Sequence, residues 1–462
     1  MERAALQELE RWNRNNRKKP LIVWGARQVG KTYLIQELFA KKYYKNSYIY
    51  VDCKKEDEIR KFCAETANAE KIIEYISLRK GTPINKNTLL IFDEVQECPN
   101  LISSLKYFCQ DFREIPVIAT GSMVRIKLQR ETHKRGATET DKFLFPVGKI
   151  NQLTIYPMTF DEFLMNSNPM LYTAVKKAYT EKKPLDSQIH QLALEQVFKY
   201  LLVGGMPEAV EAYIDGGSLL ESREILKALY DNYLADMELY QASQEAVLRS
   251  RTLFQNIYRE LNKESKNFSP GLIEENSRTR DFATSIQWLT MAHIVNQSFQ
   301  LKEHVTMPLM PDSDSNFRLF LGDIGMFSYQ SGVNAASFVS NERENTLSGI
   351  FFENFVANEL IAKENKLFYW RGKASAELEF IVESDNKLFP MDVKKGRGTL
   401  NSLEKFANHN KFECAIKISQ NNLGYHPEQK LLTIPFYFVP FLAKDLANGT
   451  MDISKYRGIY GE

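Results

Sequence analysis

The first part of the chain alternates short apolar runs with longer amphipathic stretches. The apolar runs have the length and the continuous hydrophobicity of strands buried on both faces, and they lie at 21–24, 48–51, 89–92 and 116–120. The stretches between them have the apolar spacing of helices, at 32–42, 56–77 and 101–111. Strands that alternate with helices predict right-handed βαβ crossovers and a parallel sheet, so we expect an α/β domain here.

The middle of the chain has a different pattern. Residues 160–240 have helical periodicity, which is interrupted at Gly204-Gly205-Met206-Pro207. Three short amphipathic segments follow and precede a strand-like stretch at 294–301, an order that suits a winged helix; they lie at 246–261, 270–276 and 280–292. We therefore predict a helical region at 161–245 and a winged-helix-like region at 246–330, after a first domain at 1–160.

The last part predicts a separate small α/β domain at 331–462. An amphipathic helix at 349–363 opens it. Short strands follow, at 367–370, 377–382, 388–393, 415–419 and 436–439. The apolar segment at 431–443 is broken by two prolines and is shorter than the ~20 residues of a membrane span, so we interpret it as buried strand and loop.

Composition narrows the class of protein. The chain has 462 residues, of which 44% are hydrophobic and 26% are charged, as is usual for a soluble globular protein. Its net charge of +2 neither requires nor excludes nucleic acid. The five cysteines include no CxxC pair, which argues against a disulfide framework or a zinc site. The charged N-terminus is unlike a signal peptide, so we expect a cytoplasmic protein without a membrane segment.

A phosphate-binding loop follows the first strand. Gly25-Ala26-Arg27-Gln28-Val29-Gly30-Lys31-Thr32 matches GxxxxGK[ST] between a strand and a helix, the context that this Walker A motif requires. Its glycines let successive backbone N–H groups turn toward phosphate oxygens, and the following helix adds the positive end of its dipole. We expect Lys31 to reach the β- and γ-phosphates of ATP, and the Thr32 hydroxyl to ligate Mg²⁺.

Two further strands end in polar residues at the same edge of the predicted sheet. Asp93 and Glu94 follow the apolar run Leu89-Leu90-Ile91-Phe92, as in a Walker B motif. Asp93 would hold Mg²⁺, and Glu94 would act as general base on the attacking water. Ser122 or Thr120, after the next strand, could sense the γ-phosphate or position water; a turn-capping role is the alternative.

An arginine finger would stabilise the charge that develops on the transferred phosphoryl group. Three arginines lie just beyond that strand, at Arg125, Arg130 and Arg135. The sequence does not choose among them, and a solvated basic face is the alternative.

Together these residues resemble an AAA+-type ATPase. More narrowly, the chain resembles a large prokaryotic family of predicted ATPases in which an AAA+-like domain precedes a C-terminal domain of the restriction-endonuclease-like PD-(D/E)xK fold. The resemblance extends over most of the chain and rests on these segments and on Phe145-Pro146-Val147-Gly148-Lys149, Tyr156-Pro157-Met158-Thr159-Phe160, Gly204-Gly205-Met206-Pro207-Glu208, Asp323-Ile324-Gly325, Phe352-Glu353-Asn354 and Asp392-Val393-Lys394. The family usually has Gly-Arg where Gly148-Lys149 stands here.

An acidic cluster is predicted in the C-terminal domain. If strands 377–382 and 388–393 form a hairpin that turns at Asp385-Asn386, then Glu379 lies opposite Asp392, and Glu377 lies opposite Lys394. Facing carboxylates favour a metal or a proton between them. With Glu353 on the preceding helix, Glu379, Asp392 and Lys394 match the acid, acid, (D/E)xK pattern of Mg²⁺-dependent nucleases. The alternative is a hairpin with solvated acids and a Glu377–Lys394 pair.

Two functional hypotheses follow. The first is an ATPase that couples Mg-ATP turnover to nucleic-acid binding or processing by the nuclease-like domain. The second is a non-nucleolytic ATP-driven switch or scaffold whose C-terminal domain is a degenerate interaction module. A small-molecule kinase is disfavoured because the sequence shows no second substrate pocket, and a homo-oligomer is left open.

Overall fold

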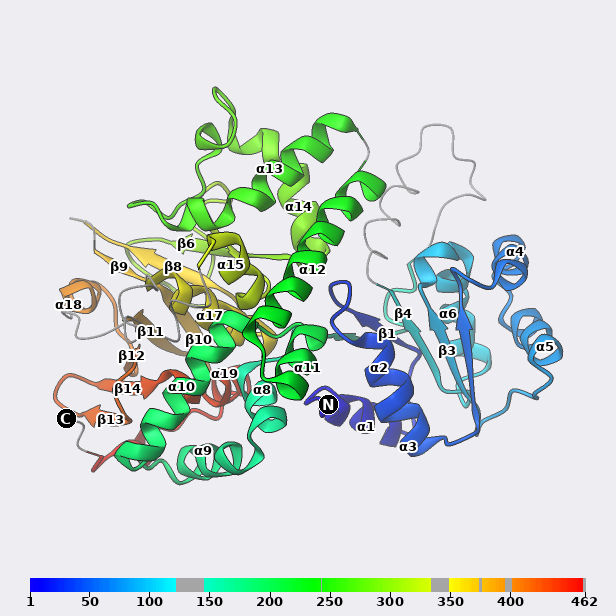
Figure 1. The fold of residues 1–462 in the computed structure, drawn as a ribbon, viewed down its shortest axis with the longest axis horizontal. Coiled ribbons are helices and arrows are strands. Elements are labelled where there is room, and N and C mark those ends of the chain that lie inside the picture. The colour runs from blue at the N-terminus through cyan, green and yellow to red at the C-terminus, as the bar shows by residue number, and fades with distance from the viewer. Residues whose placement is uncertain (122–144, 242, 334–348, 374–375, 395–400, 460–462) are drawn as a thin grey trace. The chain divides into compact units, whose positions relative to one another are not determined.

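The computed structural model describes residues 1–121, 145–241, 243–333, 349–373, 376–394 and 401–459, which form two compact units (Figure 1). The N-terminal unit comprises 2–156 together with 291–293, and the C-terminal unit comprises Met1, 157–290 and 294–462. Among the described residues, no helix is long and apolar enough to cross a membrane.

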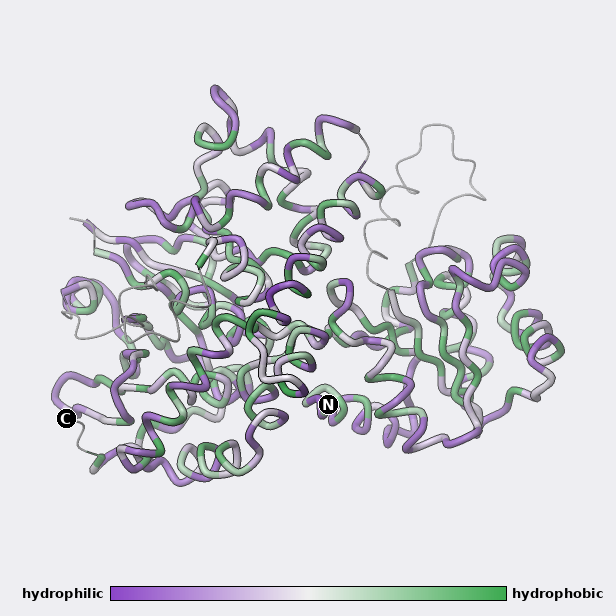
Figure 2. Tube along the Cα trace, viewed as in Figure 1, coloured by the Kyte–Doolittle hydropathy of each residue, from purple (hydrophilic) through white to green (hydrophobic). Residues whose placement is uncertain are grey.

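The N-terminal unit contains a five-stranded sheet in which all strands are parallel, as the apolar runs predict. The strand order is β2-β3-β4-β1-β5, so β4 lies between the strand that leads into the P-loop and the strand that ends in Asp93. Hydrophobic residues predominate along β1, β3 and β4 (Figure 2). The strands are β1 (Leu21–Trp24), β2 (Tyr48–Asp52), β3 (Leu89–Asp93), β4 (Val117–Thr120) and the half-exposed β5 (Asn151–Thr154), which the sequence pattern did not predict.

Helices cover both faces of this sheet (Figure 1). The predicted helix at 56–77 is wrong in one respect, because Thr66 is extended and Asn68 starts a new helix by accepting a hydrogen bond from the Lys71 N–H. The helices of the unit are α1 (Leu6–Arg14), the continuous α2 (Lys31–Tyr33), η1 (Leu34–Ala40) and α3 (Lys41–Tyr43), α4 (Asp57–Glu65), α5 (Ala69–Lys80), η2 (Val95–Glu97) and α6 (Pro99–Asp111).

Helices also make up much of the C-terminal unit. They are α8 (Phe160–Ser167), α9 (Pro169–Glu181), α10 (Ser187–Val203), α11 (Pro207–Gly216), α12 (Leu219–Tyr240), α13 (Gln244–Leu261), η4 (Pro270–Leu272), η5 (Thr279–Phe282), α14 (Ala283–Met291), α15 (Ile324–Ser331), α17 (Gly349–Ala362), α18 (Asn401–Ala407), η7 (Phe436–Phe438), α19 (Val439–Ala447) and η8 (Ile453–Tyr456). The predicted strand at 436–439 is wrong: Pro435 ends a strand, and Pro440 lies in the first turn of α19.

Two mixed sheets complete the C-terminal unit. The first has the order β10-β11-β12-β14-β13 and the second the order β7-β6-β8-β9. Their strands are β6 (Val295–Leu301), β7 (Phe317–Leu321), β8 (Phe368–Arg371), β9 (Glu377–Leu378), β10 (Phe380–Ser384), β11 (Lys387–Val393), β12 (Ala415–Ser419), β13 (Gly424–His426) and β14 (Leu431–Pro435). Because β6 pairs with both β7 and β8, the segment predicted as a winged helix shares a sheet with the segment that follows it.

Close backbone packing explains why glycine is needed in two motifs of the C-terminal unit, Gly204-Gly205 and Asp323-Ile324-Gly325. A Cβ atom on Gly205 would lie 2.0 Å from the Met158 carbonyl oxygen, and one on Gly325 would lie 2.5 Å from the Val203 carbonyl oxygen. The buried carboxylate of Asp323 accepts hydrogen bonds from the backbone N–H groups of Gly205 at 2.7 Å and Met326 at 2.9 Å. Gly204-Gly205 and Asp323-Ile324-Gly325 therefore join α10 to α15.

Candidate functional site

The P-loop takes a backbone conformation that its sequence permits. Gly25 and Gly30 have φ values of 142° and 84°, where glycine has no steric penalty, and the intervening Gln28 also has a positive φ of 63°. A Cβ atom on Gly25 would lie 2.2 Å from the Ile155 carbonyl oxygen, so the loop needs glycine at its first position. The loop ends at Gly30, where the helix that begins with Lys31 starts.

Lys31 is held inside the loop. Its side chain is buried, and Nζ donates hydrogen bonds to the carbonyl oxygens of Gly25 at 3.0 Å and Ala26 at 2.7 Å. Burial lowers the pKa of Lys31 to about 8, and the nearby carboxylates of Glu94 and Asp93 partly offset that effect. The site therefore brings the cation of the P-loop close to both acids at the end of β3.

Asp93 links the loop to two strands. Its Oδ2 accepts hydrogen bonds from the Thr32 hydroxyl at 2.8 Å and from the Tyr50 hydroxyl at 2.8 Å, while Oδ1 accepts from the Glu94 N–H at 2.9 Å. The Thr32 hydroxyl and the Asp93 carboxylate are adjacent oxygen donors, the ligand type that Mg²⁺ prefers. These residues fit a metal-bound nucleotide.

Glu94 lies immediately beyond the strand, with φ of 52°. Burial raises the pKa of its carboxyl group, and the neighbouring Asp93 raises it further; a hydrogen bond from the Gln96 amide and the charge of Lys31 act in the opposite direction. A half-buried carboxylate beside the phosphate-binding loop has the location that a general base requires.

Thr120 lies at the end of β4, between the P-loop strand and the Asp93 strand. Its hydroxyl is fully buried and has no hydrogen-bond partner within the described part of the chain. A buried polar atom without a partner at this edge of the sheet is suited to meet a phosphate oxygen or a water. Ser122, Arg125, Arg130 and Arg135, which the sequence also suggests, lie outside the described residues.

Tyr50 is a residue of this site that the sequence did not predict. It comes from the middle of β2, and the strand order that places β2 next to β3 brings its hydroxyl to Asp93. We expect Tyr50→Phe to lower kcat/KM for ATP hydrolysis by about tenfold, because one hydrogen bond to a carboxylate, worth about 1.5 kcal/mol net, is lost. Steady-state phosphate release checks this, with Tyr48→Phe on the same strand as a control; equal losses in both variants would contradict a specific role.

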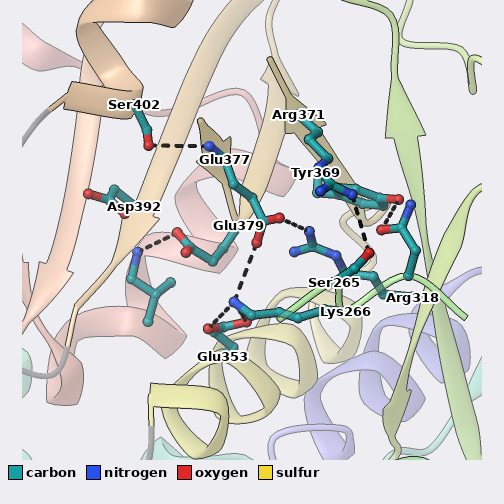
Figure 3. A network of polar contacts seen from close by, with 12 residues as sticks. Ser265, Lys266, Arg318, Glu353, Tyr369, Arg371, Glu377, Glu379, Asp392 and Ser402 are labelled. Carbon is teal, nitrogen blue, oxygen red and sulfur yellow. Dashed lines mark hydrogen bonds and ion pairs between the residues drawn. The ribbon is translucent and has the colours of Figure 1, made fainter. Parts of the chain in front are cut away.

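The acidic residues of the C-terminal unit meet in one buried network (Figure 3). The hairpin of β10 and β11 has the expected register, with Ser384 paired to Lys387 and Phe380 to Met391, and with positive φ at Asp385 and Asn386. Glu379 Oε2 accepts a hydrogen bond from the Val393 N–H at 3.0 Å. Lys394 Nζ lies 2.7 Å from Asp392 Oδ1 and 3.8 Å from Glu379 Oε1.

Two basic residues that the sequence did not suggest occupy the centre of this network. Lys266 Nζ donates to Glu353 Oε1 at 2.7 Å and Oε2 at 2.8 Å, and it lies 3.4 Å from Glu377 Oε1. The fully buried Arg318 pairs with Glu377 Oε2 at 2.5 Å and stacks over the Tyr369 ring. The predicted Glu377–Lys394 pairing is wrong, because β9 leaves the hairpin and places Glu377 opposite Arg371 of β8.

This network does not fit a divalent metal. Its four carboxylates, at Glu353, Glu377, Glu379 and Asp392, already pair with three cationic side chains, Lys266, Arg318 and Lys394. Burial raises the pKa values of both Glu353 and Glu379. Across the described residues, no group of three or more His, Cys, Asp or Glu side chains is arranged to hold a metal ion. The ammonium group of Lys266 instead binds both carboxylate oxygens of Glu353.

Comparisons with known proteins agree with the N-terminal geometry. Residues 17–164 match the model of an AAA domain, and residues 194–337 and 348–437 match two domains of unknown function, DUF8612 and DUF4143. No curated protein matches the chain.

Similar solved structures include three that are distant in sequence. The Walker-type ATPase PABY2304 of Pyrococcus abyssi has 15% identity and a TM-score of 0.42, with 71% of this chain and 94% of that chain covered. AMPPCP-bound DnaA from Aquifex aeolicus has 17% identity and a TM-score of 0.25, with 62% and 85% covered. PCH-2 of C. elegans has 13% identity and a TM-score of 0.21, with 49% and 59% covered.

The match to the AAA domain covers the parallel sheet and the site residues Lys31, Thr32, Tyr50, Asp93, Glu94 and Thr120. Residues 17–164 are therefore similar to an AAA domain, and the parallel sheet and loop of the N-terminal unit have the arrangement of a P-loop ATPase.

Proposed function

We propose that this chain hydrolyses Mg-ATP at the P-loop, and the observation that carries the proposal is the convergence of Lys31, Thr32, Asp93 and Glu94 on one end of the sheet. In this proposal the backbone N–H groups of Gly25–Thr32 and the ammonium of Lys31 bind the phosphates. Thr32 and Asp93 hold Mg²⁺, which when bound supplies a Lewis acid that neutralises charge on the phosphate oxygens.

In the hydrolytic step, Glu94 acts as the general base. Its carboxylate takes a proton from a water molecule as the water oxygen forms a bond to the γ-phosphorus. The bond between that phosphorus and the bridging oxygen of ADP breaks, which releases ADP and inorganic phosphate. Thr120 is placed to orient either the water or the γ-phosphate. Only the ionised carboxylate of Glu94 accepts a proton, so the step depends on its pKa.

Glu94→Gln should lower kcat for ATP hydrolysis by about 10²-fold, the usual contribution of a general base, while ATP affinity changes little. Because burial raises the pKa of Glu94, activity of the parent chain should fall as pH decreases through that raised pKa. Phosphate release across pH, together with equilibrium ATP binding, measures both effects. A Glu94→Gln variant that hydrolyses ATP like the parent would rule out this role, and Glu97→Gln serves as the matched control.

We also propose that the C-terminal unit is a non-nucleolytic interaction module controlled by the ATP state. The pairing of Lys266 with Glu353 supports this, because the nuclease pattern would use the Glu353 carboxylate to bind Mg²⁺. Incubation of the intact chain with Mg²⁺ and DNA or RNA should leave the nucleic acid uncut. Cleavage that disappears in Asp392→Ala would instead restore the nuclease hypothesis.

A nucleic acid is one candidate partner of the C-terminal unit. ATP turnover of the intact chain, measured with and without DNA or RNA, tests whether either polymer is that partner. Stimulation by either polymer would support coupling of the ATPase to nucleic acid, and an unchanged rate would favour a protein partner.

A further inference from the structure

Arg3 lies in the N-terminal unit before α1, and its side chain is buried against the P-loop. Its Nη1 donates to the carbonyl oxygen of Val29 at 2.8 Å, and its Nη2 donates to the carbonyl oxygen of Tyr156 at 2.8 Å. Val29 is the fifth residue of the GxxxxGK[ST] motif, so an arginine outside the motif makes a charge-assisted hydrogen bond to the backbone of the loop itself.

The geometry of the peptide bond gives this contact a consequence for phosphate binding. A trans peptide is planar, and its C=O and N–H point in opposite directions. The Val29 carbonyl belongs to the same peptide as the Gly30 N–H. By holding the carbonyl, Arg3 directs the Gly30 N–H to the opposite side of the loop, where the phosphate-binding N–H groups of a P-loop gather.

The second contact fixes the loop relative to the sheet. Tyr156 follows β5, and the neighbouring Ile155 donates its N–H to the Trp24 carbonyl oxygen at 2.8 Å. The Ile155 carbonyl also closely approaches Gly25 at the start of the loop. The planar guanidinium bridges two carbonyl oxygens at once, which a lysine ammonium cannot do with the same fixed geometry.

We propose that Arg3 is a positioning residue of the nucleotide site, which preorganises the P-loop by orienting the Val29–Gly30 peptide toward the phosphates. This inference rests on the proposed ATPase function. It assigns no contact between Arg3 and the nucleotide, so its effect is on the readiness of the loop to bind phosphate and not on the chemical step.

The test compares Arg3→Gln and Arg3→Lys with the parent in the intact chain, with Mg²⁺ and ATP as the probe. Arg3→Gln should raise Kd and KM for ATP by about tenfold, the equivalent of one charge-assisted hydrogen bond, while kcat at saturating ATP stays within about twofold of the parent. The Kd and KM of Arg3→Lys for ATP should lie between those of the parent and those of Arg3→Gln. The control is Arg11→Gln on α1, because the Arg11 side chain is 76% exposed and pairs with Glu8 one turn away on the same helix.

The outcomes separate this inference from a purely structural role. If Arg3 only stabilised the fold, both substitutions would lower the melting temperature of the nucleotide-free protein and leave KM of the folded protein unchanged, which would overturn the inference. Should Arg3→Gln not fold, the KM of Arg3→Lys decides in the same way. A parent chain that does not bind ATP would overturn the proposed function and this inference together, whereas a parent that binds ATP no better than Arg3→Gln would overturn the inference alone.

Discussion

Replacing Lys31 with alanine is expected to abolish ATP hydrolysis and to weaken ATP binding severely. Lys31 is the buried cation of the P-loop, close to Asp93 and Glu94. Without it, those two carboxylates would face the phosphates of ATP with no compensating charge from the loop. Loss of one preorganised charge-stabilising donor usually costs about 10²–10³-fold in rate, and the weaker binding adds to that loss.

Phosphate release and equilibrium ATP binding measure the effect of Lys31→Ala. A suitable control is Lys41→Ala, since Lys41 lies on the same continuous helix, is 55% exposed and pairs with Glu37. The control should bind and hydrolyse ATP like the parent, because exposed ion pairs contribute little. Near-normal hydrolysis by Lys31→Ala would mean that the P-loop is not the catalytic centre.

Lys266→Met is expected to destabilise the C-terminal unit by about 3–5 kcal/mol, the usual result of removing one partner from a buried ion pair. The substitution leaves the buried Glu353 carboxylate without its bidentate partner and removes the charge next to Glu377. Urea unfolding monitored by circular dichroism measures the loss. Lys455→Met in the same unit is the control, because Lys455 is 64% exposed.

Two further measurements identify the cause of that loss. The double variant Lys266→Met/Glu353→Gln should recover much of the stability, since a buried pair can be replaced by neutral groups at little cost. Burial raises the pKa of Glu353 and Lys266 opposes this, so the carboxyl pKa should rise further in Lys266→Met. The folded-state pKa of Glu353 then lies above its unfolded-state pKa, so the free energy of unfolding falls as pH rises from the unfolded-state pKa through the folded-state pKa. The stability lost in Lys266→Met should therefore be smallest at acid pH, below both pKa values. A deficit that is independent of pH and unchanged in the double variant would contradict this explanation.

The sequence predicted the parts of the molecule that depend on local patterns. The P-loop and the acids after β3 could be located because GxxxxGK[ST] and the apolar run before Asp93 are contiguous in the chain and each has one structural context. The hairpin register followed from the turn residues Asp385 and Asn386, whose positive φ values suit a two-residue turn.

The residues that the sequence missed act across long separations. Tyr50 reaches Asp93 through strand order, Arg3 reaches Val29 and Tyr156 through folding of the N-terminal segment, and Lys266 reaches Glu353 across 87 residues. No periodicity or motif connects such pairs, because their contacts depend on tertiary packing. The errors at 56–77 and 436–439 have a local cause instead: capping by Asn68 and the two prolines around 436–439 outweighed helical and apolar periodicity.

Turnover of Mg-ATP at this P-loop can be measured as release of inorganic phosphate from ATP by the intact purified chain, first with Mg²⁺ and then with excess EDTA. We predict release that saturates with ATP, stops when EDTA is added, and is absent from Lys31→Ala. A parent chain that releases no phosphate with Mg-ATP, or a Lys31→Ala variant that releases it at the parental rate, would contradict the account.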